Sequence, residues 1–578
     1  MGMQQTPRKR RSPWARYAPI IVIVVIVAIV GVALATRKSG KSNNNVSVGS
    51  NNGSAGTSGT NGVPLFYNDA KAKGQVAKYQ WHNCDTSTGR VAIPVLNPPP
   101  CVPEFTGNNG GATAPGVTAD TIRIGVYIAK PDPIGDALLK ATGTYDPPDN
   151  TYTAYQKYAA IYAGMYELYG RKVQIVRING TGSISDPVAA RADADTAASK
   201  GVFAVVGGPA QAREFGQELA AKHVLCVGTC MVAQPEKWYT DHEPYLWPLG
   251  PSPEQSSSMV TEFIKKQLAG KPAEWAGGSL KGQTRTFTLL TYDTPDGQFK
   301  ASWDDLAQKT KDAGVTVKAH VDYYLDFAKL QSDAKTIATK LRQAGSTSIL
   351  FTGDPLFPKY LTEEMTKQNY FPEWVMSGTV FADTNVFARS FDQQQWQHAF
   401  GLQLVPARVP KTNQDSFTLY RWWYNADPPT QNNFAVVKGD VELLFQGLQL
   451  SGPNLTTDQF KAGMDAAPPI ATGNTIQTVT TYGPHGFWPG EDPAGLDNAG
   501  LLYWDPNATG QDETGKFGTG MYRLMNGGLR YLPGRWPTAP LALFDPTNTV
   551  TIYSPNDIPP SLVPKPEPVP VNAPAHGA

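Results

Sequence analysis

The alternation of strand-like and helix-like segments through the middle of the chain constrains its fold more than any other feature. Residues 122–129 and 172–178 are short apolar runs rich in β-branched residues, which is typical of buried strands. Between them, Tyr, Ala and Met recur at helical spacing over 151–169. Further strand patterns follow at 202–207 and 224–227. Strands separated by helices of about 10–15 residues predict a parallel sheet with right-handed crossovers.

The same alternation restarts at an amphipathic helix pattern over 254–268. Four strand patterns follow, separated by helix patterns, at 286–292, 315–325, 348–352 and 374–376. Two such series predict an α/β protein with two Rossmann-like lobes. Ligands in open α/β sheets bind outside the carboxyl ends of the strands, so two facing lobes are expected to place those ends around a central cleft.

An uncharged, strongly apolar run over residues 17–36 precedes the lobes. A run of this length can cross the bilayer core of roughly 30 Å as a helix. Basic residues lie before it, in segment 1–16, which predicts a cytoplasmic N-terminus and a large extracytoplasmic C-terminal domain. Ala33-Leu34-Ala35 also resembles a signal-peptidase site, so cleavage after Ala35 is the alternative to the single-pass membrane anchor that we expect.

Composition places several other constraints on the chain. Lys and Arg number 50 against 49 Asp and Glu, so the chain lacks the basic excess of a nucleic-acid-binding protein, and we expect no nucleic-acid partner. Residues 37–62 are nearly all Ser, Gly, Asn and Thr, which predicts a flexible linker that holds the body near the membrane, or else a mere disordered leader. The Pro-rich segment 558–578 predicts an extended, disordered tail.

Four cysteines fall as two sequence-local pairs, Cys84 with Cys101 and Cys226 with Cys230. In an exported chain an even number of cysteines suggests disulfides. The first pair would close a Pro-rich loop within a Cys/Pro-rich extension over 63–117 that has little apolar periodicity. A metal or redox site is the rival interpretation, but the sequence has no C-x-x-C motif, and we expect neither metal nor cofactor.

A set of motifs occurs in a fixed order along the body. They are GVTADTIRIGVYIA at 116–129, VVGGPAQA at 205–212, VLCVGTC at 224–230, TLLTYDTPDGQ at 288–298, DFAKLQSDAKTIATKLRQAGSTSILFTGD at 326–354 and EWVMSGT at 373–379. In this order they resemble periplasmic binding proteins of type I, the branched-chain amino-acid-binding family, over about residues 115–505. The Cys-bracketed extension before them resembles those of membrane-anchored actinobacterial members.

The resemblance implies a two-lobe substrate-binding protein that closes on a small ligand and presents it to an ABC-type permease. Its lobes would be built from 118–248 (first part of lobe 1), 249–376 (first part of lobe 2) and 377–557 (return segments that complete both lobes). The other segments of the chain are then the cytoplasmic segment, the anchor, the linker, the extension and the tail, at 1–16, 17–36, 37–62, 63–117 and 558–578.

The resemblance also implies a ligand site in the loops that follow the strands. In the family, the loop after the third strand usually offers Ser or Thr hydroxyls and helix amino-terminal amides to a ligand carboxylate. This chain lacks the hydroxyls there, and Arg213 would supply charge-assisted bonds instead. Arg213 is alternatively a solvated first-turn residue. The expected lobe 1 residues are Gly208, Pro209, Ala210, Gln211, Arg213, Thr229 and Cys230.

The second lobe is expected to contribute carboxylates and hydroxyls to the same cleft. Each Asp is alternatively a helix N-cap. Tyrosines in or after strands would line the cleft or instead pack in the core. The expected residues are Asp293, Asp296, Asp354, Ser377 and Thr379, with Tyr127 and Tyr324 as the aromatic candidates. The Ser and Thr hydroxyls and the amine-binding loop that are typical of the family are altered in this chain. We therefore expect a polar or anionic small molecule rather than leucine, isoleucine or valine.

Catalytic signatures give no support to an enzyme. The chain has no HExxH, no GxSxG, no GxxxxGK[ST] and no GxGxxG after a strand. We therefore expect a transport-related binding protein and no enzymatic activity. A ligand-sensing ectodomain without a transport role is the alternative, and a cell-surface enzyme is a weaker one.

Overall fold

The computed structural model describes residues 62–209, 211–231, 233–378, 381–471, 474–490, 492–551 and 558–576. The expected cytoplasmic segment and anchor, at 1–16 and 17–36, lie outside these residues, as does the linker except for Gly62. Within the described ranges, no helix is both long and apolar enough to cross a bilayer.

Lobe 1 is built on a five-stranded, all-parallel sheet in the order β4-β3-β5-β6-β7. Four of its strands fall where the apolar runs predict them, and the short β7 adds a fifth. The strands are β3 (Thr121–Ile128), β4 (Lys172–Asn179), β5 (Ala204–Val206), β6 (Leu225–Val227) and β7 (Leu246–Trp247).

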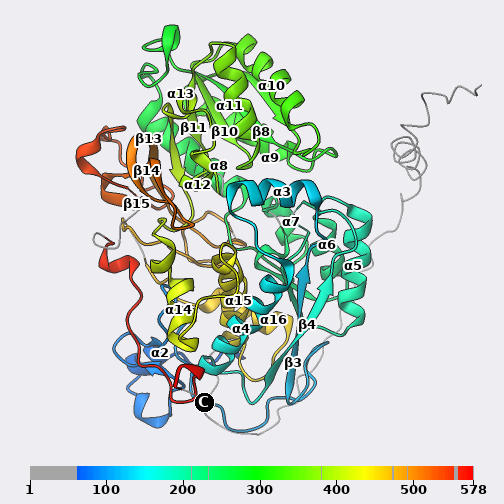
Figure 1. Ribbon diagram of the computed structural model, residues 1–578. Helices are drawn as coiled ribbons and strands as arrows, with labels where there is room; N and C mark the ends of the chain where they lie inside the picture. The colour runs from blue at the N-terminus through cyan, green and yellow to red at the C-terminus, as the bar shows by residue number, and fades with distance from the viewer. Residues whose placement is uncertain are drawn as a thin grey trace, which may run out of the picture. The chain divides into compact units, whose positions relative to one another are not determined.

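The helices of lobe 1 cover both faces of this sheet (Figure 1). Asp186 caps α5 through the amides of Val188 and Ala189, with Pro187 in the first turn, as the Asp-Pro sequence predicts. The helices are α3 (Pro133–Thr142), α4 (Pro148–Met165), α5 (Pro187–Ser199), α6 (Glu214–Ala221) and α7 (Glu236–Thr240), joined later in the chain by α14 (Asp415–Tyr424), α15 (Phe434–Leu450) and α16 (Thr457–Ala466).

Lobe 2 contains a nine-stranded mixed sheet in the order β16-β14-β13-β12-β11-β10-β8-β9, with β15 paired to β13. Strands β8 to β12 are parallel, and the return segment adds antiparallel strands beyond β12. The strands are β8 (Thr286–Tyr292), β9 (Thr316–Tyr323), β10 (Ser348–Thr352), β11 (Glu373–Met376), β12 (Ala399–Gln403), β13 (Ala499–Gln511), β14 (Phe517–Met525), β15 (Arg530–Tyr531) and β16 (Thr549–Thr551).

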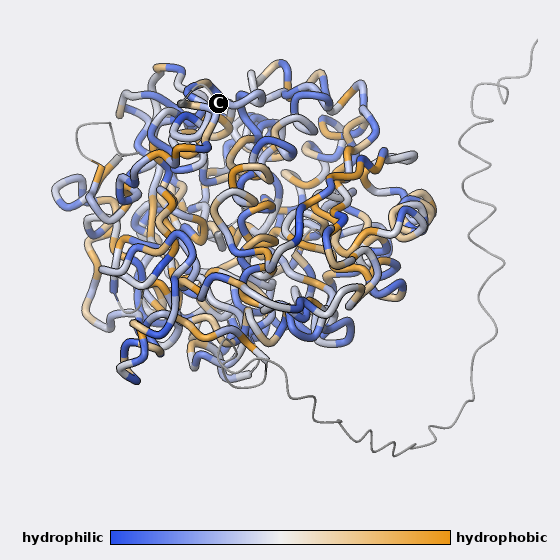
Figure 2. Tube along the Cα trace, turned by 90° about the horizontal axis from the view of Figure 1, so that it is seen from below, coloured by the Kyte–Doolittle hydropathy of each residue, from blue (hydrophilic) through white to orange (hydrophobic). Residues whose placement is uncertain are grey.

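The helices of lobe 2 pack on the two faces of its sheet, where two separate clusters of buried apolar side chains form the core. The predicted helix over 254–268 is present as α8 followed by a π-helical turn, Ile264–Leu268. The helices are α8 (Pro253–Phe263), α9 (Lys300–Asp312), α10 (Leu330–Ala344), α11 (Phe357–Lys367), α12 (Asn385–Ala388) and α13 (Gln393–Trp396). Hydrophobic positions run mainly through the interior, while many outer loops are hydrophilic (Figure 2).

The chain passes between the lobes after β7, after β12 and after α16, and its C-terminal tail passes between them once more, from Leu562 to Ala573. Each lobe is therefore assembled from segments distant in sequence, and residues near 248–252, 404–414 and 467–498 connect the two sheets. This arrangement gives the lobes a shared set of connecting segments about which they can rotate.

The N-terminal extension and the C-terminal tail pack on the lobes. The extension contains α2 (Tyr67–Ala72), β1 (Cys84–Asp85) and β2 (Arg90–Val91), and both predicted disulfides, Cys84–Cys101 and Cys226–Cys230, are present. In the tail, Leu562 is buried in the core of lobe 2 and Ala573 in that of lobe 1. Lys565 Nζ lies 2.6 Å from Asp85 Oδ2. The tail is thus packed where its composition predicts disorder, because apolar side chains between the prolines reach both cores.

Candidate functional site

The carboxyl-terminal edges of the two parallel sheets face one another. Arg213, in the loop after β5, has its Nη2 atom 3.6 Å from Asp296 Oδ2 in the loop after β8. Beside them, the Cε2 atom of Phe327 in lobe 2 lies 3.2 Å from the position that a Cβ would occupy at Gly135 in α3. Figure 1 shows α3 at the boundary between the two lobes. These contacts join loops that follow strand ends of the two lobes, the position where α/β sheets bind ligands, and the junction is termed the cleft.

The ion pair between Arg213 and Asp296 is partly exposed, with side-chain exposures of 32% and 59%. Exposed pairs of this kind contribute only about 0–1 kcal/mol. Helix α6 begins at the next residue, Glu214, so its amino-terminal amides lie at the same edge. Arg213 is therefore a cation at the cleft whose present partner is held weakly.

The loops after β5 and β6 in lobe 1 touch each other through their backbones. A Cβ at Gly208 would overlap the main-chain carbonyl of Cys230, so a side chain cannot be accommodated there. Cys230 is completely buried and bonded to Cys226 of β6. The turn that follows β6, Gly228–Cys230, is closed by this disulfide and therefore has a fixed position beside the loop after β5.

Thr229 is bound from within lobe 1 by Asp440 of α15. Its amide nitrogen and hydroxyl donate to the Asp440 carboxylate at 2.7 and 2.5 Å, and the Tyr155 hydroxyl donates at 2.6 Å. Burial raises the pKa of Asp440 to about 6, and the three hydrogen bonds partly offset this effect. Thr229 thus lies at the cleft, but its side chain points into the lobe.

Two of the predicted lobe 2 carboxylates hold helix starts. Asp293 accepts from the amides of Thr294 and Phe299, before α9. Asp354 accepts from the amides of Leu356 and Phe357 at the start of α11, and from the Tyr323 hydroxyl. Burial raises the pKa of both carboxyl groups. The Asp354 contacts have the i+2 and i+3 pattern of a helix N-cap, whereas Asp293 orders the loop ahead of α9, whose N-cap residue is Phe299. Asp296 alone of the three pairs with the other lobe through its side chain.

The remaining candidates are distributed between core and cleft. Tyr127 packs in the lobe 1 core against Phe215 and donates to Asp193, so it follows the packing alternative. Ser377 is buried and exchanges a hydrogen bond with Thr352. Tyr324 is 47% exposed after β9.

Four further candidates lie in the loops after β5 and β11, namely Pro209, Ala210, Gln211 and Thr379. Pro209 is buried, and the Gln211 amide donates to the Ile184 carbonyl. Ala210 and Thr379 lie outside the described residues.

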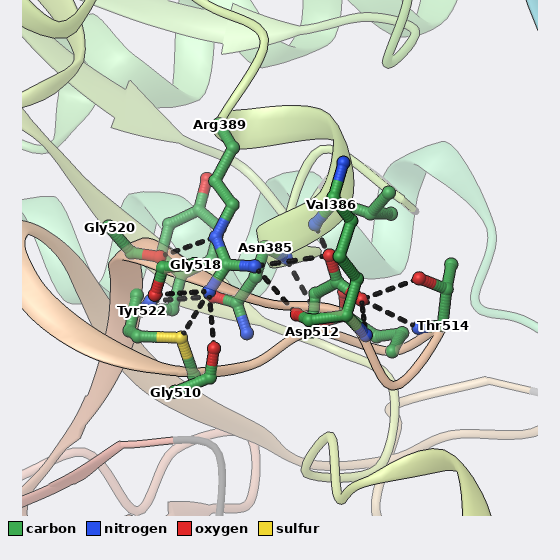
Figure 3. A network of polar contacts seen from close by, with 12 residues as sticks. Asn385, Val386, Arg389, Gly510, Asp512, Thr514, Gly518, Gly520 and Tyr522 are labelled. Carbon is green, nitrogen blue, oxygen red and sulfur yellow. Dashed lines mark hydrogen bonds and ion pairs between the residues drawn. The ribbon is translucent and has the colours of Figure 1, made fainter. Parts of the chain in front are cut away.

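A polar network fixes the loop that follows β11. Glu513, at the tip of the β13–β14 hairpin, accepts from the amides of Asn385 and Val386 and so caps α12. Figure 3 shows the Arg389 guanidinium among hairpin carbonyls and the carboxylate of Asp512, with an Nη1–Oδ2 distance of 3.1 Å. The β13–β14 hairpin therefore holds the loop that follows β11 in place.

Several residues at the site carry no local sequence signal. Asp440 lies 211 positions after Thr229 in the chain, and only the return of the chain to lobe 1 brings the two together. Phe327 and Gly135 of α3 are also distant in sequence, and only the facing of the two lobes brings them together. In the part of the chain that the structure describes, no group of three or more His, Cys, Asp or Glu is arranged to hold a metal ion.

Comparisons with known proteins identify relatives of this architecture. The sequence model of a family described as "periplasmic binding protein" matches residues 137–501. No curated protein matches the chain in sequence.

Solved structures with a similar fold include several substrate-binding proteins. An ABC transporter substrate-binding protein from Aeropyrum pernix is 14% identical, with a TM-score of 0.49, over 73% of this chain and 98% of that one. A solute-binding protein from Rhodopseudomonas palustris HaA2, in complex with p-hydroxybenzoic acid, is 12% identical, with a TM-score of 0.47, over 73% and 99%. A leucine-, isoleucine-, valine-, threonine- and alanine-binding protein from Brucella ovis is 13% identical, with a TM-score of 0.47, over 69% and 94%.

Proposed function

The chain belongs to the periplasmic binding protein family, and from that premise we propose that it is an extracytoplasmic solute-binding protein. It captures a small polar or anionic ligand between its lobes and delivers it to an ABC-type permease. The anchor expected at residues 17–36 holds it at the cell membrane. The observation that carries the proposal is the meeting of two parallel-sheet edges at Arg213 and Asp296.

Closure of the lobes is the mechanism that this geometry supports. Three connecting segments join the lobes, and the cross-cleft ion pair has little energy of its own because both side chains are partly exposed. A ligand that contacts both edges adds interactions available only when the lobes are together, so it shifts the population toward the closed form.

The charge at the cleft supports the ligand class. Arg213 and the amino terminus of α6 both favour negative charge at the lobe 1 edge. An anionic group that approaches this edge replaces Asp296 as the partner of Arg213. Asp354 accepts hydrogen bonds at both carboxylate oxygens and Asp293 accepts two at Oδ1, so both carboxylates already serve donors within lobe 2, whereas Asp296 bonds across to lobe 1.

Arg213→Ala is expected to weaken binding of the ligand by about 1.5–3 kcal/mol, since hydrogen bonds to charged groups are worth that much. This corresponds to roughly 10- to 150-fold in Kd. Calorimetry against benzoate, succinate, glutamate, phosphate and leucine measures it. Lys222→Ala is the matched control, because Lys222 ends the same helix and pairs with Asp195 and Glu218.

Micromolar binding of leucine that is unaffected by Arg213→Ala would overturn both the ligand class and the role of Arg213. Equal losses in Arg213→Ala and Lys222→Ala would show a general effect on α6 instead of a contact with the ligand.

A further inference from the structure

A single buried carboxylate supports the cleft-facing turn of lobe 1. Asp440 is completely buried in α15, and its two oxygens receive the Thr229 amide, the Thr229 hydroxyl and the Tyr155 hydroxyl. All three donors come from other elements, two from the turn and one from α4. The carboxylate therefore joins the turn to the helical layer behind the sheet.

The turn is shaped to let this carboxylate approach. Gly228 has a φ of +71°, and a Cβ at this position would overlap the Asp440 carboxylate. A glycine is therefore required both by the backbone conformation and by the close approach. The disulfide between Cys226 and Cys230 fixes the two ends of the same segment. Cys230 in turn lies against Gly208 of the neighbouring loop, so a displacement of the turn also reaches the loop that carries Arg213.

We propose that Asp440 is a positioning residue of the ligand cleft. Asp440 holds the Gly228–Cys230 turn, and through it the adjoining Gly208 loop, in the arrangement that binds the ligand. This inference rests on the proposed function for its consequence on ligand binding. The hydrogen bonds that carry it lie within lobe 1 and do not depend on the ligand.

Protonation of Asp440 changes what the carboxyl group can accept. As a carboxylate it accepts all three hydrogen bonds, whereas the neutral acid must use one oxygen as a donor, and the arrangement around Thr229 and Tyr155 no longer matches. Burial raises the pKa of Asp440 to about 6, so this change falls in a mildly acidic range. The turn is held at neutral pH and loosens as the pH falls below about 6.

The surroundings of Asp440 contain few other charges that can change this outcome. Tyr155 of α4 faces it directly, and burial raises the pKa of that hydroxyl well above 10, so it stays a neutral donor. The nearby strands β5 and β6 bring no titratable side chain, since Cys226 is in a disulfide. On α15 itself Lys438 pairs with Glu442 and with Asp415 of α14, and on α16 Lys461 pairs with Asp465. On α4, Asp149 pairs with Arg177 and Lys157 lies over the Tyr424 ring.

Local order and global stability respond to this group in opposite directions. The folded pKa lies above the ordinary value of 3.8, so Asp440 contributes less stability as the pH rises from about 4 through 6. The order of the turn instead increases over the same interval. If Asp440 only stabilised the fold, the order of the turn and the free energy of unfolding would change in the same direction with pH. Opposite changes therefore identify the positioning role.

Hydrogen exchange of the full-length chain, read by mass spectrometry on the peptide that contains Thr229, tests the proposal without any ligand. After correction for the intrinsic rate, the wild-type turn is expected to exchange at least about tenfold faster at pH 5 than at pH 7.5, the factor that corresponds to one hydrogen bond of about 1.4 kcal/mol. Asp440→Asn is expected to show the fast rate at both pH values. Glu442→Gln, two positions along the same helix in the Lys438 cluster, is the control and keeps the wild-type behaviour.

Equal protection of the wild-type turn at both pH values overturns the proposal, and this comparison stands even if Asp440→Asn does not fold. Equal loosening in Glu442→Gln also overturns it, because the effect would then belong to any buried acid of α15. The proposed function fails separately, if the protein binds none of the tested ligands while the turn still responds to pH as expected. Asp440 then remains a support of the turn, and the transport role is removed.

Discussion

Glu373→Gln is expected to lower the free energy of unfolding by about 3–5 kcal/mol, because it leaves a buried arginine without its counter-charge. Arg285 and Glu373 form a two-point contact at 2.9 and 3.0 Å, with side-chain exposures of 2% and 0%. Glu373 also accepts from the Ser348 hydroxyl, and Arg285 donates to the Leu268 carbonyl. The pair therefore joins the start of β11 to β10 and to the end of the α8 segment. Urea or guanidinium unfolding at neutral pH measures the loss.

Two variants separate the charge from the packing. The double variant Arg285→Met/Glu373→Leu is expected to recover much of the loss, since replacing a whole buried pair by apolar side chains is often neutral or stabilising. Lys300→Ala breaks an exposed pair with Asp304 in the same lobe and is expected to leave the free energy of unfolding close to that of the wild type. A loss below about 1 kcal/mol in Glu373→Gln would contradict the assignment of this pair as a desolvated contact.

Lys438→Met is expected to cost about 3–5 kcal/mol at pH 8 and clearly less at pH 5.5. Lys438 is almost buried and lies 2.7 Å from Asp415 of α14 and 2.6 Å from Glu442 of its own helix. Burial raises the pKa of Glu442 to about 7, and Lys438 opposes this shift. A carboxyl group whose folded pKa is raised contributes less stability as the pH rises through that value. Without the lysine the pKa of Glu442 rises further, so the deficit grows with pH.

Chemical unfolding at the two pH values measures this difference. Lys461→Met is the control, because Lys461 is more exposed and pairs with Asp465 on α16, and it is expected to cost less than about 1 kcal/mol at either pH. An equal deficit at pH 5.5 and pH 8 would show that Lys438 stabilises the lobe by filling space and not by its charge.

Much of the lobe architecture is predictable from short apolar runs. The pattern at 348–352 matches β10 at both ends, and the one at 286–292 matches β8. These strands are buried on both faces, so most of their residues are apolar, aromatic or β-branched whatever the function. The β13–β14 hairpin is different. It belongs to the return segments, where the change from parallel to antiparallel pairing depends on which sheet the chain rejoins, and this is a tertiary property.

The site is predictable only as a set of loops. Asp354 directly precedes a helix, so its binding of the Leu356 and Phe357 amides follows from local sequence, whereas the bond from the Phe299 amide to Asp293 depends on how the intervening loop folds. The partner of Arg213 does not, because Asp296 comes from the other lobe and only the arrangement of the lobes brings it within 3.6 Å. Asp440 is unpredictable for the same reason. The Pro-rich tail shows that composition alone overstates disorder when a few apolar residues, such as Leu562, reach an existing core.

Ligand capture at Arg213 is decided by native mass spectrometry of the full-length chain, extracted from membranes in mild detergent and incubated with benzoate, succinate, glutamate or phosphate. One bound small molecule per chain is expected in the wild type and in Lys222→Ala, and a much lower occupancy in Arg213→Ala, because Arg213 lies at the cleft and Lys222 at the far end of α6. The bare polypeptide mass in every preparation, or a bound molecule that Arg213→Ala retains in full, would contradict it.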